Sequence, residues 1–283
     1  GDLWKVETGG GRAMRLTSHP ADETRSVWSP DGEHIAFMSN RDGYSNIWRM
    51  RADGSDIRRV TDLDRTCTVT DWAEVGGEER ILFHAVLEHD VYREFRPYHV
   101  SPEGGPVERV HDAFGSQPRV APDGERILFA RGGYYDGWER RHYRGAENQD
   151  VWIFDPEDDS FTRLTEWEGN DGKSHWQSNS TVLYLSDRSD RTVNLFRRRV
   201  GQPEDRATRL TRFDGRDIHD WSVSRDGETA VLMSWDALYR LDLDRPGATP
   251  RRIDVTAIQD TRDTQEFVTI GRNVTDAALP PDG

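Results

Sequence analysis

One phrase recurs six times along this chain of 283 residues: a short aromatic strand-like segment, a turn, and a second segment that ends in Arg-Leu-Thr or a close variant. The arginine of that ending recurs at intervals of 44, 50, 54, 46 and 43 residues. Such intervals are typical of four-stranded blades and exceed the roughly 33- to 34-residue period of helical repeats. The copies occupy residues 3–17, 47–61, 98–111, 151–165, 195–211 and 238–254.

A second phrase lies between these copies, as in SVWSPDGEHIAFMSNRDG (26–43) and QPRVAPDGERILFARGG (117–133). It consists of a strand, a turn of the Pro-Asp-Gly type and a second strand with alternating apolar residues. Asp-Gly supplies the positive φ that a tight hairpin needs, and proline fixes φ before it. Strands and turns that repeat without a helical period predict an all-β, antiparallel protein.

A four-stranded sheet of this kind cannot bury both faces alone, so successive sheets must stack, and radial closure leaves only short edges exposed. We therefore predict a six-bladed β-propeller of four-stranded antiparallel blades, with strands A to D counted outward from the axis. Four aromatic residues then repeat on strand C, and we expect them to fill the space between blades. They are Trp4, Trp48, Trp152 and Tyr239.

Both ends of the chain fall inside a repeat. The chain opens on a strand C at Leu3, and NVTDAALPPDG (273–283) resembles the beginning of another A–B hairpin. We expect residues 1–255 to form the propeller. Residues 256–283 are predicted either to close the ring against residues 3–17 or to begin a second propeller. The pattern indicates a segment cut from a longer protein at both ends.

Charge and composition exclude several classes of partner. The net charge of −14 repels phosphate backbones, so nucleic acid is not an expected partner. No apolar run approaches the roughly 20 residues needed to span a bilayer, so no membrane partner is expected. The single cysteine, Cys67, excludes an intrachain disulfide and is predicted to be a small core residue.

The repeats resemble those of TolB-like propellers, of prolyl oligopeptidase-type propellers and of tricorn-type proteases. A more specific element is WERRHYRGAENQDVWIFD (138–155). It is similar to a stretch of the N-terminal six-bladed propeller of tricorn-like (S41-type) serine proteases, in which Trp and Tyr-Arg-Gly precede a strand of the Asp-Ile-Trp-Ile-Phe-Asp type. This chain differs by Ala146 in place of a second glycine and by two extra residues between Trp138 and Tyr143.

The resemblance implies a cytoplasmic serine peptidase, a homo-oligomer that degrades short peptides and whose catalytic domains follow residue 283. In that family the first propeller is a scaffold and a channel for peptides or products, and no cofactor is implied. No G-x-S-x-G elbow occurs, so no catalytic residue is predicted in this segment. Two alternatives remain open: a TolB-like protein-binding propeller and a metal-dependent propeller lyase. A propeller attached to an α/β-hydrolase is a further reading.

The long insertion between two strands, Arg131–Gln149, combines aromatic residues with arginines. Arginine grips a carboxylate through two hydrogen bonds, so such a loop suits peptide binding, but an aromatic-rich loop also suits docking on a neighbouring domain. In the family, basic residues of this propeller are thought to hold a peptide's C-terminus, and the corresponding loop here offers Arg65. The candidates for peptide binding or docking are Trp138, Arg140, Arg141, Tyr143, Arg144 and Arg65.

A metal site built from histidines is the basis of the lyase alternative. His111, His175 and His219 are each predicted to fall in a loop that joins strand D to the next strand A, and such loops converge on one face of a propeller. Three imidazoles from neighbouring blades could bind zinc, manganese or iron. No H-x-x-x-H or C-x-x-C spacing accompanies them, so no metal is the first expectation.

Overall fold

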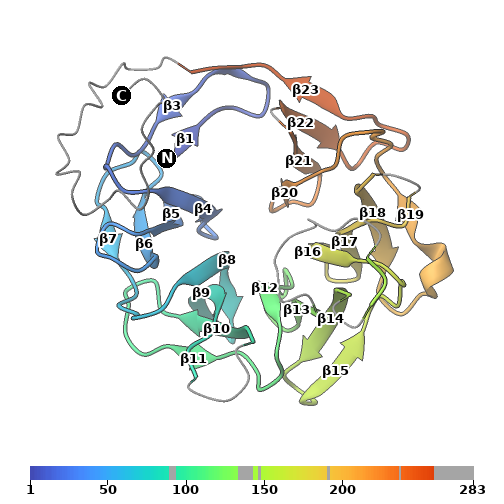
Figure 1. Ribbon diagram of the computed structural model, residues 1–283, viewed down its shortest axis with the longest axis horizontal. Coiled ribbons are helices and arrows are strands. Elements are labelled where there is room, and N and C mark those ends of the chain that lie inside the picture. Colours follow the sequence, from blue (N-terminus) through green and yellow to red (C-terminus); the bar gives the residue numbers. More distant parts are fainter. Residues whose placement is uncertain (89–93, 133–142, 146–147, 190–191, 236, 258–283) are drawn as a thin grey trace, which may run out of the picture.

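The computed structural model describes residues 1–88, 94–132, 143–145, 148–189, 192–235 and 237–257 (Figure 1). Five four-stranded antiparallel sheets follow one another around a common axis, each with its first strand innermost. The predicted all-β propeller with four-stranded antiparallel blades is confirmed. These sheets are called blades 1 to 5 in chain order.

The strands of blades 1 and 2 have the following bounds. Blade 1 consists of β4 (Glu23–Trp28), β5 (His34–Ser39), β6 (Asn46–Arg51) and β7 (Arg58–Arg59), and blade 2 of β8 (Cys67–Val75), β9 (Glu78–Ala85), β10 (Arg96–Val100) and β11 (Glu108–Arg109).

Blades 3 to 5 repeat the same order. Blade 3 consists of β12 (Ser116–Val120), β13 (Ile127–Arg131), β14 (Asp150–Asp155) and β15 (Ser160–Arg163). Blade 4 consists of β16 (Asp171–Ser178), β17 (Thr181–Ser186), β18 (Asn194–Arg199) and β19 (Thr208–Arg209), with the short 3-10 helix η1 (Glu204–Arg206) before its last strand. Blade 5 consists of β20 (Asp220–Val223), β21 (Thr229–Ser234), β22 (Ala237–Asp242) and β23 (Arg251–Ile253).

A sixth four-stranded blade was expected, and the described residues hold only part of one. β1 (Trp4–Lys5) and β3 (Met14–Arg15) form a two-stranded antiparallel sheet that stands between blade 5 and blade 1 (Figure 1). β2 (Gly11–Arg12) pairs in parallel with β24 (Val255–Thr256), which follows blade 5. The two ends of the described chain therefore meet, while most of the predicted segment 256–283 lies outside the described residues.

The recurring threonine of the Arg-Leu-Thr ending holds strand D against strand C. In each case the buried threonine Oγ1 accepts a hydrogen bond of 2.9 to 3.0 Å from a backbone N–H at the beginning of the neighbouring strand. This bond lies within one sheet, so it recurs wherever the ending carries threonine, in the β1–β3 sheet and in blades 1, 3 and 4. The pairs are Thr17 with Leu3, Thr61 with Ile47, Thr165 with Val151 and Thr211 with Leu195.

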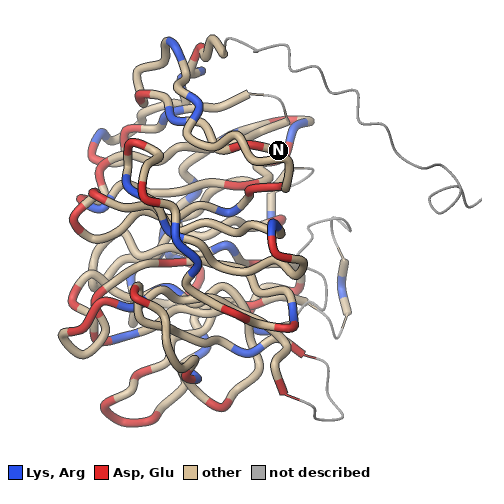
Figure 2. Tube along the Cα trace, turned by 90° about the vertical axis from the view of Figure 1, so that its left-hand side faces the viewer, with Lys and Arg blue, Asp and Glu red and all other residues tan. Residues whose placement is uncertain are grey.

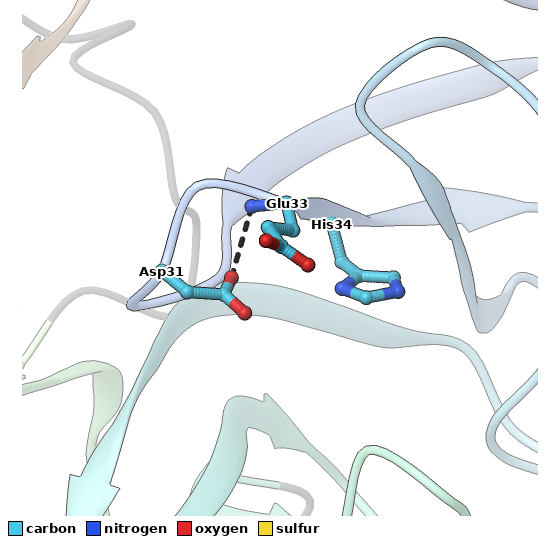
Figure 3. A group of neighbouring side chains, drawn as sticks. All are labelled: Asp31, Glu33 and His34. Carbon is cyan, nitrogen blue, oxygen red and sulfur yellow. Dashed lines mark hydrogen bonds between the residues drawn. The ribbon is translucent and has the colours of Figure 1, made fainter.

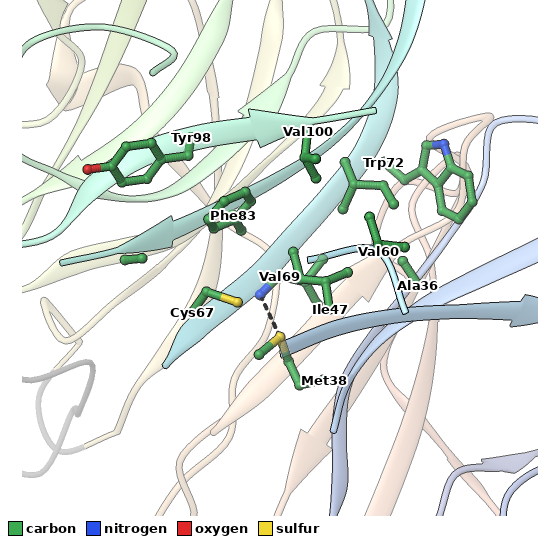
Figure 4. Packing of buried hydrophobic residues seen from close by; sticks show 12 residues of the cluster. Ala36, Met38, Ile47, Val60, Cys67, Val69, Trp72, Phe83, Tyr98 and Val100 are labelled. Atoms are coloured by element: carbon green, nitrogen blue, oxygen red, sulfur yellow. Dashed lines mark hydrogen bonds between the residues drawn. The ribbon is translucent and has the colours of Figure 1, made fainter. Parts of the chain in front are cut away.

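Apolar side chains from adjoining blades pack between them. Between blades 1 and 2, Met38 lies near Val69, whose N–H points at the Met38 sulfur at 3.3 Å, and Phe83 stacks on Tyr98 with ring centres 5.6 Å apart (Figure 4). Cys67 belongs to this cluster, and burial raises its thiol pKa to about 12, so it is a core residue as predicted.

Three of the four strand C aromatics also lie against the core between blades, whereas the fourth, Trp4, is 38% exposed and does not fill such a space as expected. Trp48, Trp152 and Tyr239 each pack against a separate hydrophobic cluster, as expected. Guanidinium groups lie over two of these rings, with Arg41 4.6 Å from the centre of Trp48 and Arg131 5.5 Å from that of Trp152. Across the residues described, no helix has the length and apolar character needed to cross a membrane.

Candidate functional site

In every blade the end of strand B, the beginning of strand C and the beginning of strand A lie on one face of the propeller. In blade 1 the end of strand B pairs both with the beginning of strand A, as Ser39 with Glu23, and with the beginning of strand C, as Ser39 with Asn46. The same register recurs in blade 4. The insertion between β13 and β14 therefore leaves from this face, which we call the insertion face.

Part of the predicted site on this face is described. Trp138, Arg140 and Arg141 lie outside the described residues. Tyr143 is half-buried, and Arg65 is exposed in the connection from β7 to β8. Because three of the six candidates lie outside the described residues, their role in peptide binding or docking stays a prediction.

Arg144 fastens the end of the insertion to blade 4. Its guanidinium lies 5.1 Å from the centre of the Trp167 ring and 3.4 Å from the buried carboxylate of Asp187. The Trp167 Nε1 donates to the other Asp187 oxygen at 2.8 Å, and the amide of Asn170 donates to it at 3.1 Å. Arg144 thus already has an anionic partner within the chain.

A buried acid–arginine pair lies beside this contact. Arg188 Nη2 is 2.5 Å from Asp171 Oδ2 and 2.8 Å from Glu204 Oε1, and its Nε donates to Ser186 Oγ at 2.9 Å. Burial raises the pKa of Asp171 to about 7, and Arg188 opposes that rise. Blade 1 repeats the arrangement with Arg41 and Glu23 at 2.9 Å, which indicates a structural role for both pairs.

The inner strands carry an unusual backbone feature at equivalent places. β4, β12 and β16 each contain a register shift opposite strand B, and each shift includes one non-glycine residue with positive φ. These residues are Arg25 (φ 50°), Gln117 (φ 59°) and Lys173 (φ 46°). A β-bulge re-aims the side chain of its extra residue, and here all three are long and polar.

Polar contacts link these residues from blade to blade around the axis. Arg25 Nη1 lies 3.5 Å from Asp220 Oδ2, and Lys173 Nζ lies 3.7 Å from Asp220 Oδ1. Lys173 Nζ also donates to the carbonyl oxygen of His219 at 2.6 Å. Blades 1 and 5 are not adjoining blades, since the β1–β3 sheet stands between them, so the Arg25–Asp220 pair reaches across that gap.

A second pair completes the set. Burial raises the pKa of Asp71 and lowers that of Arg119, while the attraction between the two charges opposes both shifts. Asp71 also accepts the amides of Trp72 and Val120 at 2.9 Å each. We call the whole set the axial cluster: Arg25, Asp71, Gln117, Arg119, Lys173 and Asp220, contributed by all five blades.

Sequence reasoning missed the axial cluster. A usable signal was present, because charged residues directly precede the segments predicted to be innermost strands, as in Thr-Arg-Ser-Val (24–27) and Lys-Ser-His-Trp (173–176). Along the chain as a whole, acidic and basic residues are intermingled, as Figure 2 shows.

The three histidines of the metal alternative lie in three different environments, and His175 lies within strand β16 and not in a connection as predicted. In blade 2, His111 stands at the position where other sheets have the threonine that holds strand D against strand C. Its ring centre lies 4.4 Å from that of Phe129, and burial lowers the pKa of His111 to about 4. His175 lies 4.4 Å from the Trp221 ring, where burial lowers its pKa well below its usual value, and His219 meets Trp235 edge to face. Over the described ranges their imidazole nitrogens are not grouped as ligands of one ion.

One other group of possible ligands occurs where the chain is described: Asp31, Glu33 and His34, in the turn between β4 and β5 (Figure 3). Asp31 Oδ1 already accepts the Glu33 amide at 2.9 Å and the Ser29 hydroxyl at 2.5 Å. Asp226 makes the same two bonds in blade 5, where a threonine replaces the histidine. The closeness of these three side chains in blade 1 is therefore explained by the geometry of a turn that recurs in the fold.

Comparison with known proteins identifies relatives of this arrangement. Residues 1–246 match the family described as the tricorn protease N-terminal beta propeller domain. The chain is 28% identical over 257 residues to tricorn protease homolog 1 of Streptomyces coelicolor, covering 90% of this chain and 23% of that protein. It is 30% identical over 141 residues to an uncharacterized protein of Agrobacterium fabrum, covering 46% of this chain and 47% of that protein. The chain thus spans about half of one relative and about a quarter of the other.

Solved structures share the fold. The crystal structure of the tricorn protease superposes with a TM-score of 0.69 at 17% identity, over 86% of this chain and 24% of that one. A putative TolB from Agrobacterium tumefaciens superposes with a TM-score of 0.65, also at 17% identity, over 84% of this chain and 83% of that one. At such identity the likeness concerns the fold alone.

Proposed function

Because this chain belongs to the family of tricorn protease N-terminal β-propeller domains, we propose that it is the non-catalytic propeller of a larger serine-type (S41-type) peptidase. In this proposal it is a scaffold for downstream catalytic domains and a passage for short peptides or products. The whole protein is a cytoplasmic homo-oligomer. Arg144 belongs to the scaffold, because its contact with Asp187 ties the insertion to blade 4.

The axial cluster is the observation that carries the proposed passage. Five inner strands bring charged or amide side chains toward the axis, where a propeller with only a scaffold role could place apolar ones. Pairs such as Arg25–Asp220 are partly exposed, with side-chain exposures of 43% and 45%. A peptide backbone needs hydrogen-bonding partners wherever it leaves water, and such side chains supply them.

Photocrosslinking tests the passage. A short peptide with a benzophenone group is irradiated with the purified chain, and the attachment sites are mapped by mass spectrometry. We expect attachment on β4, β8, β12, β16 and β20, with no cleavage of the peptide by the chain alone. Attachment confined to the outermost strands β7, β11, β15, β19 and β23 would contradict the passage. Cleavage by the purified chain would contradict the non-catalytic assignment.

We also propose that the native ring has six blades, and that the sixth is completed by a strand pair added to the inner edge of β1. Three exposed aromatic or apolar side chains support this: Trp4 on β1 is 38% exposed, Trp28 on β4 is 46% exposed and Met233 on β21 is 39% exposed. Leu232 packs toward blade 4, so its neighbour Met233 faces the opposite side, toward the β1–β3 sheet. Lys5 of β1 lies 5.1 Å from the Trp28 ring centre.

Hydrogen exchange tests this sixth blade. We expect peptides that cover β1 to exchange at least about 100-fold faster than peptides that cover β6, because β6 is hydrogen-bonded on both sides and β1 on one. In a longer polypeptide from the same protein, β1 becomes as protected as β6. A version that ends at residue 257 shows whether residues 258–283 contribute. The proposal would be contradicted if β1 were as protected as β6 already in the version that ends at residue 257, and not only in the longer polypeptide.

A further inference from the structure

A short connection on the insertion face carries a tryptophan in a backbone conformation that disfavours it. Ser234 of β21 pairs with Ala237 of β22, so only two residues join these strands. The favoured two-residue hairpin loops require positive φ at their first residue, a place usually filled by asparagine, aspartate or glycine. Here the first residue is Trp235, with φ 54°. For a bulky side chain this conformation is a genuine outlier, so the turn does not account for the tryptophan.

Burial does not account for Trp235 either. Its side chain is 61% exposed, and it is the most exposed large hydrophobic side chain among the described residues. An exposed tryptophan leaves apolar surface in water, which is unfavourable, and the positive φ adds strain to the turn. A bulky residue that stabilises neither the turn nor the core is expected where its ring meets a ligand.

The Trp235 ring lies beside the start of the innermost strand of blade 5. It meets the ring of His219 at an angle of 89°, with ring centres 5.9 Å apart, and His219 directly precedes β20. The carbonyl oxygen of His219 accepts a hydrogen bond of 2.6 Å from Lys173 Nζ of blade 4. A single residue, His219, therefore connects Trp235 with the axial cluster.

An aromatic ring beside a set of polar groups suits one residue of a bound peptide. The side chain of that residue packs on the ring, and its backbone finds hydrogen-bonding partners among the polar groups of the axial cluster. Aromatic rings pair edge to face or offset-stacked, and the contact between His219 and Trp235 shows that the ring is open to an edge-to-face partner. The matching side chains are those of phenylalanine, tyrosine and tryptophan.

We propose that Trp235 is a binding platform for an aromatic side chain of a peptide in the axial passage, at the insertion face. The platform makes the passage selective for peptides that carry phenylalanine, tyrosine or tryptophan. His219 is a positioning residue, because its ring contacts the ring of Trp235. This inference rests on the proposed passage of peptides along the axis.

Binding of two fluorescent-labelled peptides, followed by anisotropy, tests the platform. One probe is tetra-alanine amide, and the other is the same peptide with phenylalanine at its second position. We expect the purified chain to bind the phenylalanine probe about 10-fold more tightly than the alanine probe. Trp235→Asn should weaken binding of the phenylalanine probe about 10-fold and leave the alanine probe unchanged. Because asparagine adopts positive φ readily, this variant is expected to have a Tm at least equal to that of the parent chain.

Tyr44→Asn is the matched control. Tyr44 is 57% exposed in the connection from β5 to β6 on the same face, and its φ is not positive, so loss of its ring should leave both affinities unchanged. The same two probes are also titrated into a longer polypeptide from the same protein, in which the preference for phenylalanine should persist. Its loss there would mean that the sixth blade covers Trp235, and would overturn the platform.

Equal affinity of the parent chain for the two probes would also overturn the platform while leaving the passage intact. So would a Trp235→Asn variant that keeps the preference for phenylalanine and melts at a lower temperature, because Trp235 would then have a structural role. Failure of the benzophenone peptide to attach to the inner strands in the crosslinking experiment would instead overturn the passage itself.

Discussion

Replacement of Arg188 by methionine is expected to lower the free energy of unfolding by about 3 to 5 kcal/mol at pH 8. The Asp171 carboxylate would then be buried with its cation removed, because its side chain is fully buried and Arg188 provides the 2.5 Å contact. Arg188 also links Glu204 and lies 5.6 Å from the Tyr184 ring centre, so methionine keeps part of the packing and loses the charge.

The loss is expected to be smaller at pH 5.5. Burial raises the pKa of Asp171 to about 7 from 3.8 even beside Arg188, and removal of the cation raises it further. A group whose pKa is raised on folding contributes stability that disappears as the pH rises through that pKa, here from about 4 to 7. At pH 5.5 the variant therefore buries a neutral acid, whereas at pH 8 it must bury a charge.

Urea denaturation at the two pH values measures the difference. Arg58→Met, on the exposed strand β7, is the control and should change stability by less than about 0.5 kcal/mol. The double variant Asp171→Asn with Arg188→Met is expected to recover a large part of the loss at pH 8. An equal loss at both pH values would show that packing, and not the uncompensated carboxylate, is responsible.

Replacement of Asn194 by alanine is expected to lower the free energy of unfolding by about 3 kcal/mol. Its side chain is fully buried at the beginning of β18. Its Oδ1 accepts the Thr211 hydroxyl and the Phe213 amide at 2.8 Å each, and its Nδ2 donates to the carbonyl oxygens of Thr192 and Phe213. The alanine variant lacks both the accepting oxygen and the donating nitrogen of the asparagine side chain. Several buried polar groups of neighbouring residues are then left without a hydrogen-bond partner.

Two further variants calibrate the effect. Thr211→Val keeps the shape and removes one hydroxyl, so we expect a smaller loss of about 1 to 2 kcal/mol. Asn179→Ala, at an exposed turn of the same blade, should cost less than about 1 kcal/mol. Thermal unfolding with the same protein concentration measures all three. A loss for Asn194→Ala no larger than that for Asn179→Ala would contradict the stabilising role assigned to the hydrogen bonds of Asn194.

The blades could be predicted from the sequence because their decisive contacts are local. The Arg-Leu-Thr ending predicts a strand D, and the structure adds that Thr61 or Thr211 bonds the strand directly before it in the chain. The Pro-Asp-Gly turn likewise closes through bonds within a few residues, as at Asp31. Such contacts recur in each copy of the sequence repeat, so the length of the repeat predicts the length of chain in one blade.

The axial cluster could not be predicted in the same way. Arg25 and Asp220 lie at distant points of the chain and meet only after five blades surround one axis. For His111 the sequence suggested a metal ligand because of its position in the repeat. Its burial beside Phe129 depends on the neighbouring blade and could not be predicted from that position. The number of blades in the ring could not be predicted from local sequence patterns either, since the segment that holds β1 and β3 is joined to blade 5 by long-range contacts such as the β2–β24 pair.

That parallel pair has a consequence for the order in which the chain folds. Each blade can form soon after its own residues leave the ribosome, because its contacts are short in sequence. β2 can pair with β24 only after Val255, near the other end of the described chain, has been made, because Gly11 pairs with that residue. Loop closure over so long a stretch is slow and comes last, so newly made molecules pass through a stage in which an unzipped N-terminal strand pair is open to partners from other molecules.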